Sequence, residues 1–516
     1  MPSAVKVSIT HRQAGGHEHG AADWGSGVNG LDPRAPVIVG VGQVNVDSPG
    51  APEPADLLAE AASVAGRDSG AEQLLKSLDS VRVVKSLSWR YRDLGALVAN
   101  RLGASPAHTV CTTEGGQTPQ AVMNQAASDI QAGHCDAVLI GGVEAWRQRM
   151  AYKARGLRPD WTRQPEDVAP SEIFGPELFM ANDYEQSLGL SIPIQFYPLF
   201  ESALRHASGR SLDEHTRSIS ELWARFSDVA AGNPYAALRR RYTAEEIRAP
   251  APANRMVGYP YTKLMNSNNS VNQAAALLVC SVEAARGAGV PAERMVFPVA
   301  GGEADDVPAV SNRPDLASSP AIRAAGRTAL ELAGVGVDDI AHVDLYSCFP
   351  SAVQVAAAEL GLSLERQLTV TGGLTFAGGP WNSYVCHSIA TMVDILRRAP
   401  GLGLCSANGG LLTKHVIGVY SAEPHPAGFR AEKLGCVTGG ERTLATAERT
   451  PATVEAYTVM HDRAGEPERA HLSAILPDGR RGWGVTTDRE VMISMMQTEW
   501  CGSTVERLED GSIRIP

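Results

Sequence analysis

The stretch that decides the fold of this chain lies at residues 132–144 and reads AGHCDAVLIGGVE. Its centre, residues 137–140, is an uninterrupted apolar run rather than an alternation of apolar and polar residues. Strands with this pattern are buried on both faces, as in parallel sheets that helices cover on either side. The preceding residues 121–132 carry apolar side chains at helical spacing. The chain is therefore predicted to have an α/β fold in which strands and helices alternate.

The same order of elements occurs twice. In the first copy, Gly115 and Gly116 precede the helix that leads into residues 132–144. In the second, GGP at residues 378–380 precedes a helix that leads into LGLCSANGG at residues 402–410. Self-similarity of this kind indicates two copies of one unit. We expect each copy to form a βα sheet and the two sheets to pack together.

The rest of the chain divides by composition. A Gly-, Ala- and His-rich start is expected to be a disordered tail, with His17 and His19 as polar residues rather than metal ligands. A long insertion rich in Arg, Tyr and Pro is expected to form a lid. A linker with prolines and glycines then leads to alternating segments, which predict a separate small β domain of OB type. The expected boundaries are tail 1–32, first unit 33–145 and 256–300, insertion 146–255, second unit 301–422, linker 423–445 and β domain 446–516.

Composition and charge exclude several classes of function. The chain has 516 residues and a net charge of −11, and its longest basic block is Arg239-Arg240-Arg241, so we expect no binding to nucleic acid or membrane. No apolar run approaches the roughly 20 residues that span a bilayer, and the start lacks a signal peptide's apolar block. The eight cysteines lack the spacings of a zinc site or a disulfide framework. We therefore expect a cytoplasmic protein with reduced thiols and no metal site.

Several stretches together resemble the thiolase superfamily. Residues 132–144 resemble the helix end and strand that follow the nucleophile in thiolases. Other stretches resemble the sterol-carrier-protein type of thiolase in order and spacing: NPYA at 233–236, YTAEEI at 242–247, the strand at 274–281, YSCF at 346–349 and LC at 404–405. The resemblance covers residues 36–420, and with the β domain the chain resembles thiolase-like proteins of type 1. It implies two packed mixed sheets in a layered αβαβα arrangement, an inserted loop domain and an OB-like domain.

The resemblance implies chemistry on a coenzyme A thioester, but two positions that would carry it are altered. Thiolases use an acylated cysteine at a helix N-terminus, where the helix dipole favours the thiolate. That position falls on Gly115 or Gly116 here, and the histidine of a Gly-His-Pro motif corresponds to Gly379. Cys111 is interpreted as a packed strand thiol and His387 as a core histidine. The sequence therefore predicts the loss of the nucleophile and of a general base.

Three further residues complete the site that the resemblance implies. Tyr346 replaces the histidine of a His-Asp-Cys-Phe motif, and a phenol can donate a hydrogen bond to a thioester oxygen or act as an acid or base. A packed tyrosine is the alternative. Cys405 corresponds to the second catalytic cysteine of thiolases, or else is a buried strand residue without function. The backbone N–H groups of Gly115 or Gly116 and of Ala407 are predicted to bind a carbonyl oxygen.

The function implied by the resemblance is binding of coenzyme A or acyl-CoA in lipid metabolism, without thiolysis. Arg239, Arg240 and Arg241 are candidates for binding the coenzyme's phosphates, although three arginines also suit a solvated surface. Two alternatives stay open. One is a lyase similar to the thiolase-like aldolases of steroid side-chain breakdown, which use tyrosines and a small OB-containing partner. The other is a non-catalytic scaffold. A homodimer is compatible with the resemblance, and no covalently bound cofactor is expected.

Overall fold

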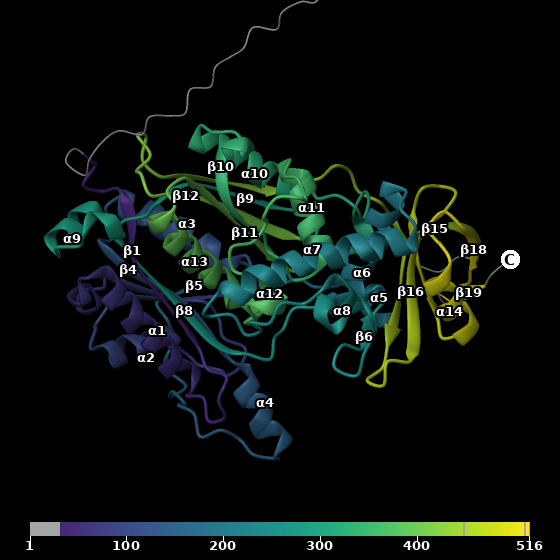
Figure 1. The fold of residues 1–516 in the computed structure, drawn as a ribbon, viewed down its shortest axis with the longest axis horizontal. Coiled ribbons are helices and arrows are strands. Elements are labelled where there is room, and N and C mark those ends of the chain that lie inside the picture. Colours follow the sequence, from purple (N-terminus) through teal and green to yellow (C-terminus); the bar gives the residue numbers. More distant parts are fainter. Residues whose placement is uncertain (1–30, 447–448, 510–511, 515–516) are drawn as a thin grey trace, which may run out of the picture.

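Three β-sheets organise the chain, described for residues 31–446, 449–509 and 512–514 of a computed structural model (Figure 1). The tail expected at residues 1–32, with His17 and His19, lies outside these ranges except for its last two residues. The first sheet has the order β1-β8-β4-β2-β3-β5 and the second the order β10-β11-β12-β9-β13. Their strands are β1 Pro36–Asn45, β2 Ser80–Val83, β3 His108–Thr112, β4 Ala137–Ala145, β5 Glu172–Phe174, β8 Asn272–Ser281, β9 Phe297–Asp305, β10 Ile340–Asp344, β11 Leu402–Gly409, β12 Lys414–Ser421 and β13 Arg430–Cys436.

The two sheets repeat one pairing scheme. In the first, β1 pairs antiparallel with β8, β8 antiparallel with β4, and β4 parallel with β2. In the second, β9 pairs antiparallel with β12, β12 antiparallel with β11, and β11 parallel with β10. Strand β4, which contains the apolar run at 137–140, is buried along its whole length. The two-fold repeat and the α/β class predicted from the sequence are therefore confirmed.

Helices separate the sheets into αβαβα layers. Helices α3 (Thr118–Gln131) and α13 (Tyr384–Arg398) pack between the sheets, because each contacts strands of both. Helices α1 (Pro54–Ser69) and α2 (Leu94–Leu102) cover the outer face of the first sheet. Helix α10 (Pro320–Ala333), with α11 (Pro350–Leu360) beside it, covers the outer face of the second. This arrangement brings the start of α3 next to the ends of β10 and β11.

The insertion after β4 is helical and adds a strand to the first sheet. Its strand β5 pairs parallel with β3. Helices α6 and α7 pack against α11, and α7 also contacts α12, whereas α4 has no buried residue and projects from the body in Figure 1. No helix among the described residues is both long enough and apolar enough to cross a bilayer. The remaining helices are α4 Trp146–Ala154, α5 Asp183–Ser187, α6 Pro193–Ser208, α7 Leu212–Gly232, α8 Ala244–Arg248, α9 Val282–Gly287 and α12 Gly373–Phe376.

The C-terminal segment forms the third sheet, with the order β14-β17-β16-β15-β18-β19. A parallel bridge between Val485 and Ser512 links the β19 end back to β17, so the sheet curves round on itself. The short strands β6 (Met256–Gly258) and β7 (Tyr261–Thr262) join it through β15. The OB-type identity of this domain stays a prediction. Its elements are β14 Leu444–Ala445, β15 Thr450–His461, β16 Pro467–Ile475, β17 Arg481–Thr486, α14 Arg489–Gln497, β18 Thr504–Arg507 and β19 Ile513–Arg514.

The expected linker and the separateness of the β domain need correction. Strand β13 lies inside the stretch 423–445 and pairs parallel with β9, so this stretch extends the second sheet. Its residues are mostly exposed, which is why no apolar pattern indicated a strand. The β domain packs on α6 through β15. Its buried Arg481 pairs with Glu455 at 2.7 Å and donates a hydrogen bond to the backbone oxygen of Arg313 at 2.6 Å. The domain is therefore anchored to the body by a buried charge.

Candidate functional site

A cavity of about 530 Å³ opens at the start of α3, where both copies of the repeat and the insertion meet. Tyr346 reaches it from just beyond β10, which is the strand end at which α/β sheets bind ligands. The lining residues are Leu87, Glu114, Gly115, Gly116, Leu178, Met180, Ser191, Ile192, Pro193, Ile194, Tyr197, Asn266, Ser267, Asn269, Tyr346, Cys348, Phe349, Leu374, Trp381, Asn382, Asn408 and Gly410. Three of the residues predicted from the sequence, Gly115, Gly116 and Tyr346, thus share one cavity.

Gly116 has no room for a side chain. A Cβ atom at this position would clash with the hydroxyl group of Tyr346 and lie 2.5 Å from the backbone oxygen of Asn408. Real Cβ atoms essentially never come closer than 3.0 Å to such neighbours. Tyr346 therefore occupies the volume in which a nucleophilic side chain at residue 116 would stand.

Gly379 shows the same exclusion. A Cβ atom there would clash with the hydroxyl group of Ser267 and lie 3.0 Å from Oδ1 of Asn269. The Gly379 N–H donates a hydrogen bond to the backbone oxygen of Asn268 at 2.9 Å. Two residues further on, Trp381 adopts a φ of 47°, a left-handed conformation that concentrates at functional sites when a non-glycine residue holds it. The loop at residues 267–269 thus fills the place of the missing histidine.

The two glycine N–H groups differ in what they bind. The Gly115 N–H donates to Oδ1 of Asn382 at 3.0 Å, and Nδ2 of Asn382 donates to the backbone oxygen of Lys85 at 3.0 Å. In the described part of the chain, no hydrogen bond engages the Gly116 N–H. It lies just before α3, where the helix dipole adds partial positive charge. Of the two, the Gly116 N–H is the one available to a carbonyl oxygen.

Three cavity residues were not singled out in the sequence: Asn408, Cys348 and Tyr197. Nδ2 of Asn408 donates to the hydroxyl group of Tyr197 at 2.9 Å and lies 3.9 Å from Sγ of Cys348. Oδ1 of Asn408 is buried and has no partner among the described residues. Strand periodicity is the signal that could have found Asn408, because Ser406 shares its face of β11 and accepts a hydrogen bond from the Tyr346 N–H at 2.8 Å.

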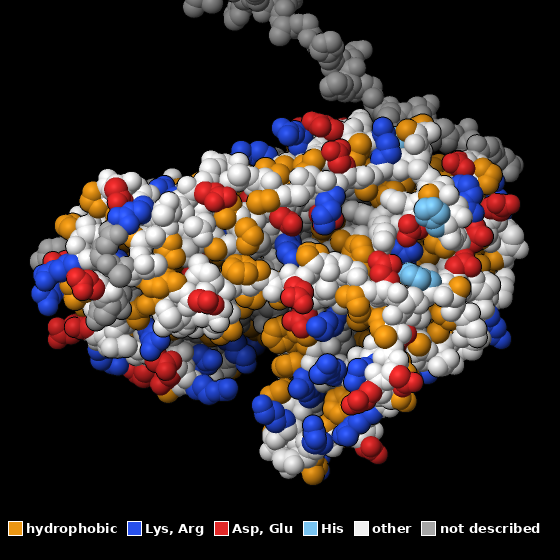
Figure 2. Space-filling model, turned by 180° about the vertical axis from the view of Figure 1, so that it is seen from behind, with side chains coloured by type: hydrophobic (Ala, Val, Ile, Leu, Met, Phe, Trp, Pro, Cys, Tyr) orange, Lys and Arg blue, Asp and Glu red, His pale blue; other side chains and the backbone are white. Residues whose placement is uncertain are grey.

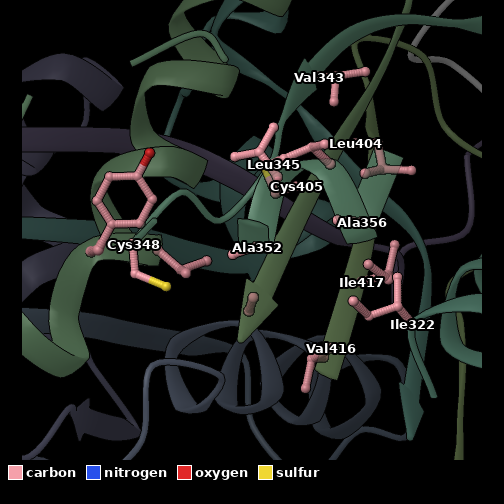
Figure 3. Close-up of a cluster of buried hydrophobic side chains, with 14 of the residues drawn as sticks. Ile322, Val343, Leu345, Cys348, Ala352, Ala356, Leu404, Cys405, Val416 and Ile417 are labelled. Carbon is pink, nitrogen blue, oxygen red and sulfur yellow. The ribbon is translucent and has the colours of Figure 1, made fainter. Parts of the chain in front are cut away.

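Cys405 and Ala407 lie outside the cavity lining, so the catalytic role predicted for the Cys405 side chain is not supported, whereas the role of the Ala407 N–H stays a prediction. Side chains alternate along a strand, so these two belong to the opposite face of β11 from Asn408. Cys405 is 0% exposed, and Figure 3 shows it beside Leu345 and Leu404 in the apolar core, apart from Cys348. Burial raises the pKa of the Cys405 thiol. It is therefore a core residue.

The phenol of Tyr346 and the thiol of Cys348 are neutral at physiological pH. Burial raises the pKa of Tyr346, and it raises the pKa of Cys348 to about 12. The phenol is therefore a hydrogen-bond donor, and the thiol is not a thiolate. Cys111 lines an adjoining cleft, and burial raises its pKa to about 11. His387 lies outside the cavity, shares a 2.8 Å hydrogen bond with Gln43 and has a pKa lowered by burial to about 3.

The three arginines expected to bind phosphate lie apart from the cavity. Arg239, Arg240 and Arg241 are exposed and line no part of it. Arg240 pairs with Glu246, and Arg241 lies 3.8 Å from Asp228. Their placement fits the solvated surface that was the alternative interpretation.

Two family models match the chain. The thiolase C-terminal domain-like model covers residues 302–367, and the model of the additional C-terminal domain of thiolase-like protein type 1 covers residues 440–512. Acetyl-CoA acetyltransferase of Methanocaldococcus jannaschii is 22% identical over 268 residues, which are 52% of this chain and 60% of that protein. The chain thus matches less than two thirds of that relative's length.

Two solved structures share the fold. The Ltp2-ChsH2(DUF35) aldolase matches 75% of this chain and 98% of its own with a TM-score of 0.58 and 18% identity, a likeness of fold alone. A monomeric SCP2-thiolase-like protein type 1 from Mycobacterium smegmatis matches 94% of this chain and 100% of its own, with a TM-score of 0.79 and 31% identity. That relationship, together with the matched C-terminal domain, shows that the chain belongs to the type 1 thiolase-like proteins of the thiolase superfamily.

Proposed function

We propose that this protein binds acyl-coenzyme A thioesters in the cavity and holds the thioester group without becoming acylated. The observation that carries the proposal is that Gly116 and the hydroxyl group of Tyr346 lie close together. The Gly116 N–H, which has no hydrogen-bond partner among the described residues, and a protonated phenol lie next to each other at the cavity wall. Both are hydrogen-bond donors, and two such donors suit a carbonyl oxygen. The unpartnered Oδ1 of Asn408 adds an acceptor beside them.

The rest of the lining suits an acyl group. The cavity volume of about 530 Å³ falls in the usual range for small-molecule sites, which are mostly apolar with a few polar groups. Its apolar residues come from the insertion, from the loop before α2, from the end of β10 and from α12: Leu87, Leu178, Met180, Ile192, Pro193, Ile194, Phe349 and Leu374. The unpaired thiols suit a reducing compartment, so we assign this role to acyl-CoA metabolism in the cytoplasm.

Thiolysis is not part of the proposal, because we find no activated nucleophile among the described lining residues of the cavity. Gly116 cannot be acylated, and the one cysteine among the described lining residues is Cys348, whose pKa is about 12. Losing an activated nucleophile typically removes several orders of magnitude of covalent catalysis.

A lyase is the weaker candidate. Tyr346 lies where a retro-aldol reaction on an acyl-CoA could use a phenol, but such a reaction needs a base to take a proton. Histidine and lysine are absent from the described lining residues, and Glu114 lies 2.8 Å from Nζ of Lys85 in an ion pair. Because burial raises its pKa, Tyr346 keeps its own proton. The cavity can therefore polarise a carbonyl group but has no evident group to deprotonate a substrate.

Calorimetric titration with acetyl-CoA, paired with an assay of acetoacetyl-CoA thiolysis, tests the proposal. We expect saturable binding of acetyl-CoA and no thiolysis above background. Thiolysis that is abolished in a Cys348→Ser variant would overturn the proposal, because it would show an acyl-enzyme. A folded protein that binds no acyl-CoA would favour the scaffold alternative instead.

A further inference from the structure

A second hollow adjoins the cavity. It is a cleft of about 830 Å³, lined by the segment 84–94, the end of β3, the segment 173–178 and Arg149 from α4. Leu87, Glu114 and Leu178 line both hollows. The two hollows therefore share a boundary at these three residues.

The cleft carries more basic than acidic side chains. Its cationic lining residues are Lys85, Arg90, Arg92 and Arg149, against the carboxylates of Glu114 and Glu177. Lys85 is neutralised by Glu114 at 2.8 Å. Nη1 of Arg149 donates to the backbone oxygen of Leu87 at 2.6 Å, which holds that guanidinium at the boundary between the hollows.

Two guanidinium groups of the cleft have no ion-pair or hydrogen-bond partner among the described residues. Arg90 and Arg92 are exposed, and their side chains form no ion pair or hydrogen bond with any described residue. Arg147, Lys153 and Arg155 stand on or just after the adjoining α4, and Figure 2 shows Lys and Arg side chains gathered on the protrusion at the lower edge, where α4 lies. This concentration of positive charge stands out on a chain with a net charge of −11. Such a region attracts a polyanionic ligand.

We infer that the cleft binds the phosphorylated nucleotide end of an acyl-coenzyme A through Arg90 and Arg92, while the acyl end occupies the cavity. The inference rests on the proposed function and names the part of the chain that binds the phosphates. Guanidinium groups bind phosphate oxygens with paired, charge-assisted hydrogen bonds. Trp89 lines the same cleft, and its ring is contacted by the Arg163 guanidinium at 5.9 Å and edge-on by Trp161.

The inference replaces the role expected for the arginines at 239–241. None of those three lines either hollow, and two of them have acidic neighbours. They provide a matched comparison, because Arg239 and Arg241 are exposed side chains, as Arg90 and Arg92 are.

The test compares acetyl-CoA with acetyl-pantetheine, which carries the thioester but no nucleotide. Calorimetry is run on the wild type, on Arg90→Ala/Arg92→Ala and on Arg239→Ala/Arg241→Ala, with thermal unfolding as a check on folding. We expect the cleft variant to bind acetyl-CoA about 10- to 100-fold more weakly, the usual worth of charge-assisted hydrogen bonds, and acetyl-pantetheine as the wild type does. The 239/241 variant should bind both ligands normally.

The outcomes separate the two proposals. Wild-type binding of acetyl-pantetheine supports the cavity assignment whatever the cleft does. An unchanged acetyl-CoA affinity in the folded cleft variant would overturn the inference and leave the proposed function standing. Equal losses for both ligands would also overturn it, because the arginines would then act on the cavity rather than on the nucleotide. A wild type that binds neither ligand would remove both proposals.

Discussion

The cavity and the cleft lie side by side but differ in the charge and the solvent exposure of the polar groups that line them. In the cavity, burial keeps the phenol of Tyr346 and the thiol of Cys348 protonated and neutral. In the cleft the polar groups are charged, and Arg90 and Arg92 are exposed to solvent. An isolated charge is costly to bury but inexpensive at an open surface. One half of this composite site therefore suits a neutral thioester, and the other suits phosphates.

Under the proposed function, the same difference explains how a thiolase fold could keep a ligand site without covalent catalysis. Covalent catalysis needs a thiolate, which requires stabilisation of a negative charge in the interior. A backbone N–H group and a protonated phenol need no such charge, and Gly116 and Tyr346, which supply them, both line the cavity. Binding can therefore persist where acylation cannot.

The largest effect that we expect comes from restoring a cysteine in the cavity. Gly116→Cys should lower the free energy of unfolding by about 3 kcal/mol or more, because its Cβ would press on Tyr346 and on the backbone oxygen of Asn408. Denaturant unfolding measures this. Gly287→Cys is the control, since a Cβ at that glycine meets nothing within 4 Å. If both variants are equally stable, the space at Gly116 is not closed as described.

A buried carboxyl group beside the boundary between the two hollows should make the free energy of unfolding depend on pH. Leu87 lines both hollows, and its N–H donates to the buried carboxyl group of Glu144 at 2.6 Å. Burial raises the pKa of Glu144 from 4.5 to about 7. The folded state then binds the proton more tightly than the unfolded state, so this stabilisation is complete below pH 4.5 and is lost as the pH rises through about 7. The total is about 3 kcal/mol.

Urea unfolding across that pH range, for the wild type and for Glu144→Gln, measures the contribution of this carboxyl group. The variant should lack the wild-type decline in stability between pH 4.5 and 7. Curves of the same slope would show that Glu144 titrates as it does in the unfolded chain.

A smaller effect should separate the thioester from the rest of the coenzyme. Tyr346→Phe removes one hydrogen-bond donor from the cavity and should weaken acetyl-CoA binding by about 0.5–1.5 kcal/mol while leaving free coenzyme A binding unchanged. Calorimetry with both ligands checks this. If the variant is folded and its acetyl-CoA affinity is intact, Tyr346 is a packing residue and the cavity half of the comparison fails.

The smallest effect concerns ionic strength. Exposed charges are screened by salt, with a screening length of about 10 Å at 0.1 M. Raising the salt concentration should therefore weaken acetyl-CoA binding by about 0.5 kcal/mol and leave acetyl-pantetheine binding unaffected, since only the nucleotide meets the cleft. If salt weakened the binding of both ligands equally, the assignment of the nucleotide to the cleft would be contradicted.

The sequence predicted the architecture well because periodicity and repetition are local signals. The apolar run at 137–140 indicated the buried strand, and the two glycine-led copies indicated the paired sheets. Tyr346 could be found because residues 346–349 resemble the His-Asp-Cys-Phe motif of the sterol-carrier-protein type of thiolase. Cys405 was misplaced because motif spacing ignores side-chain alternation, which brings Asn408 to the cavity instead. The cleft was missed because its cations come from separate segments, and β13 was missed because a charged edge strand has no apolar pattern.

One measurement tests the central claim most directly: intact-protein mass spectrometry of samples saturated with acetyl-CoA and with acetoacetyl-CoA, with binding followed on the same samples by calorimetry. The account predicts a saturable binding signal and a protein mass that stays that of the unmodified chain. A covalent acyl adduct that disappears in a Cys348→Ala or Cys111→Ala variant would contradict it.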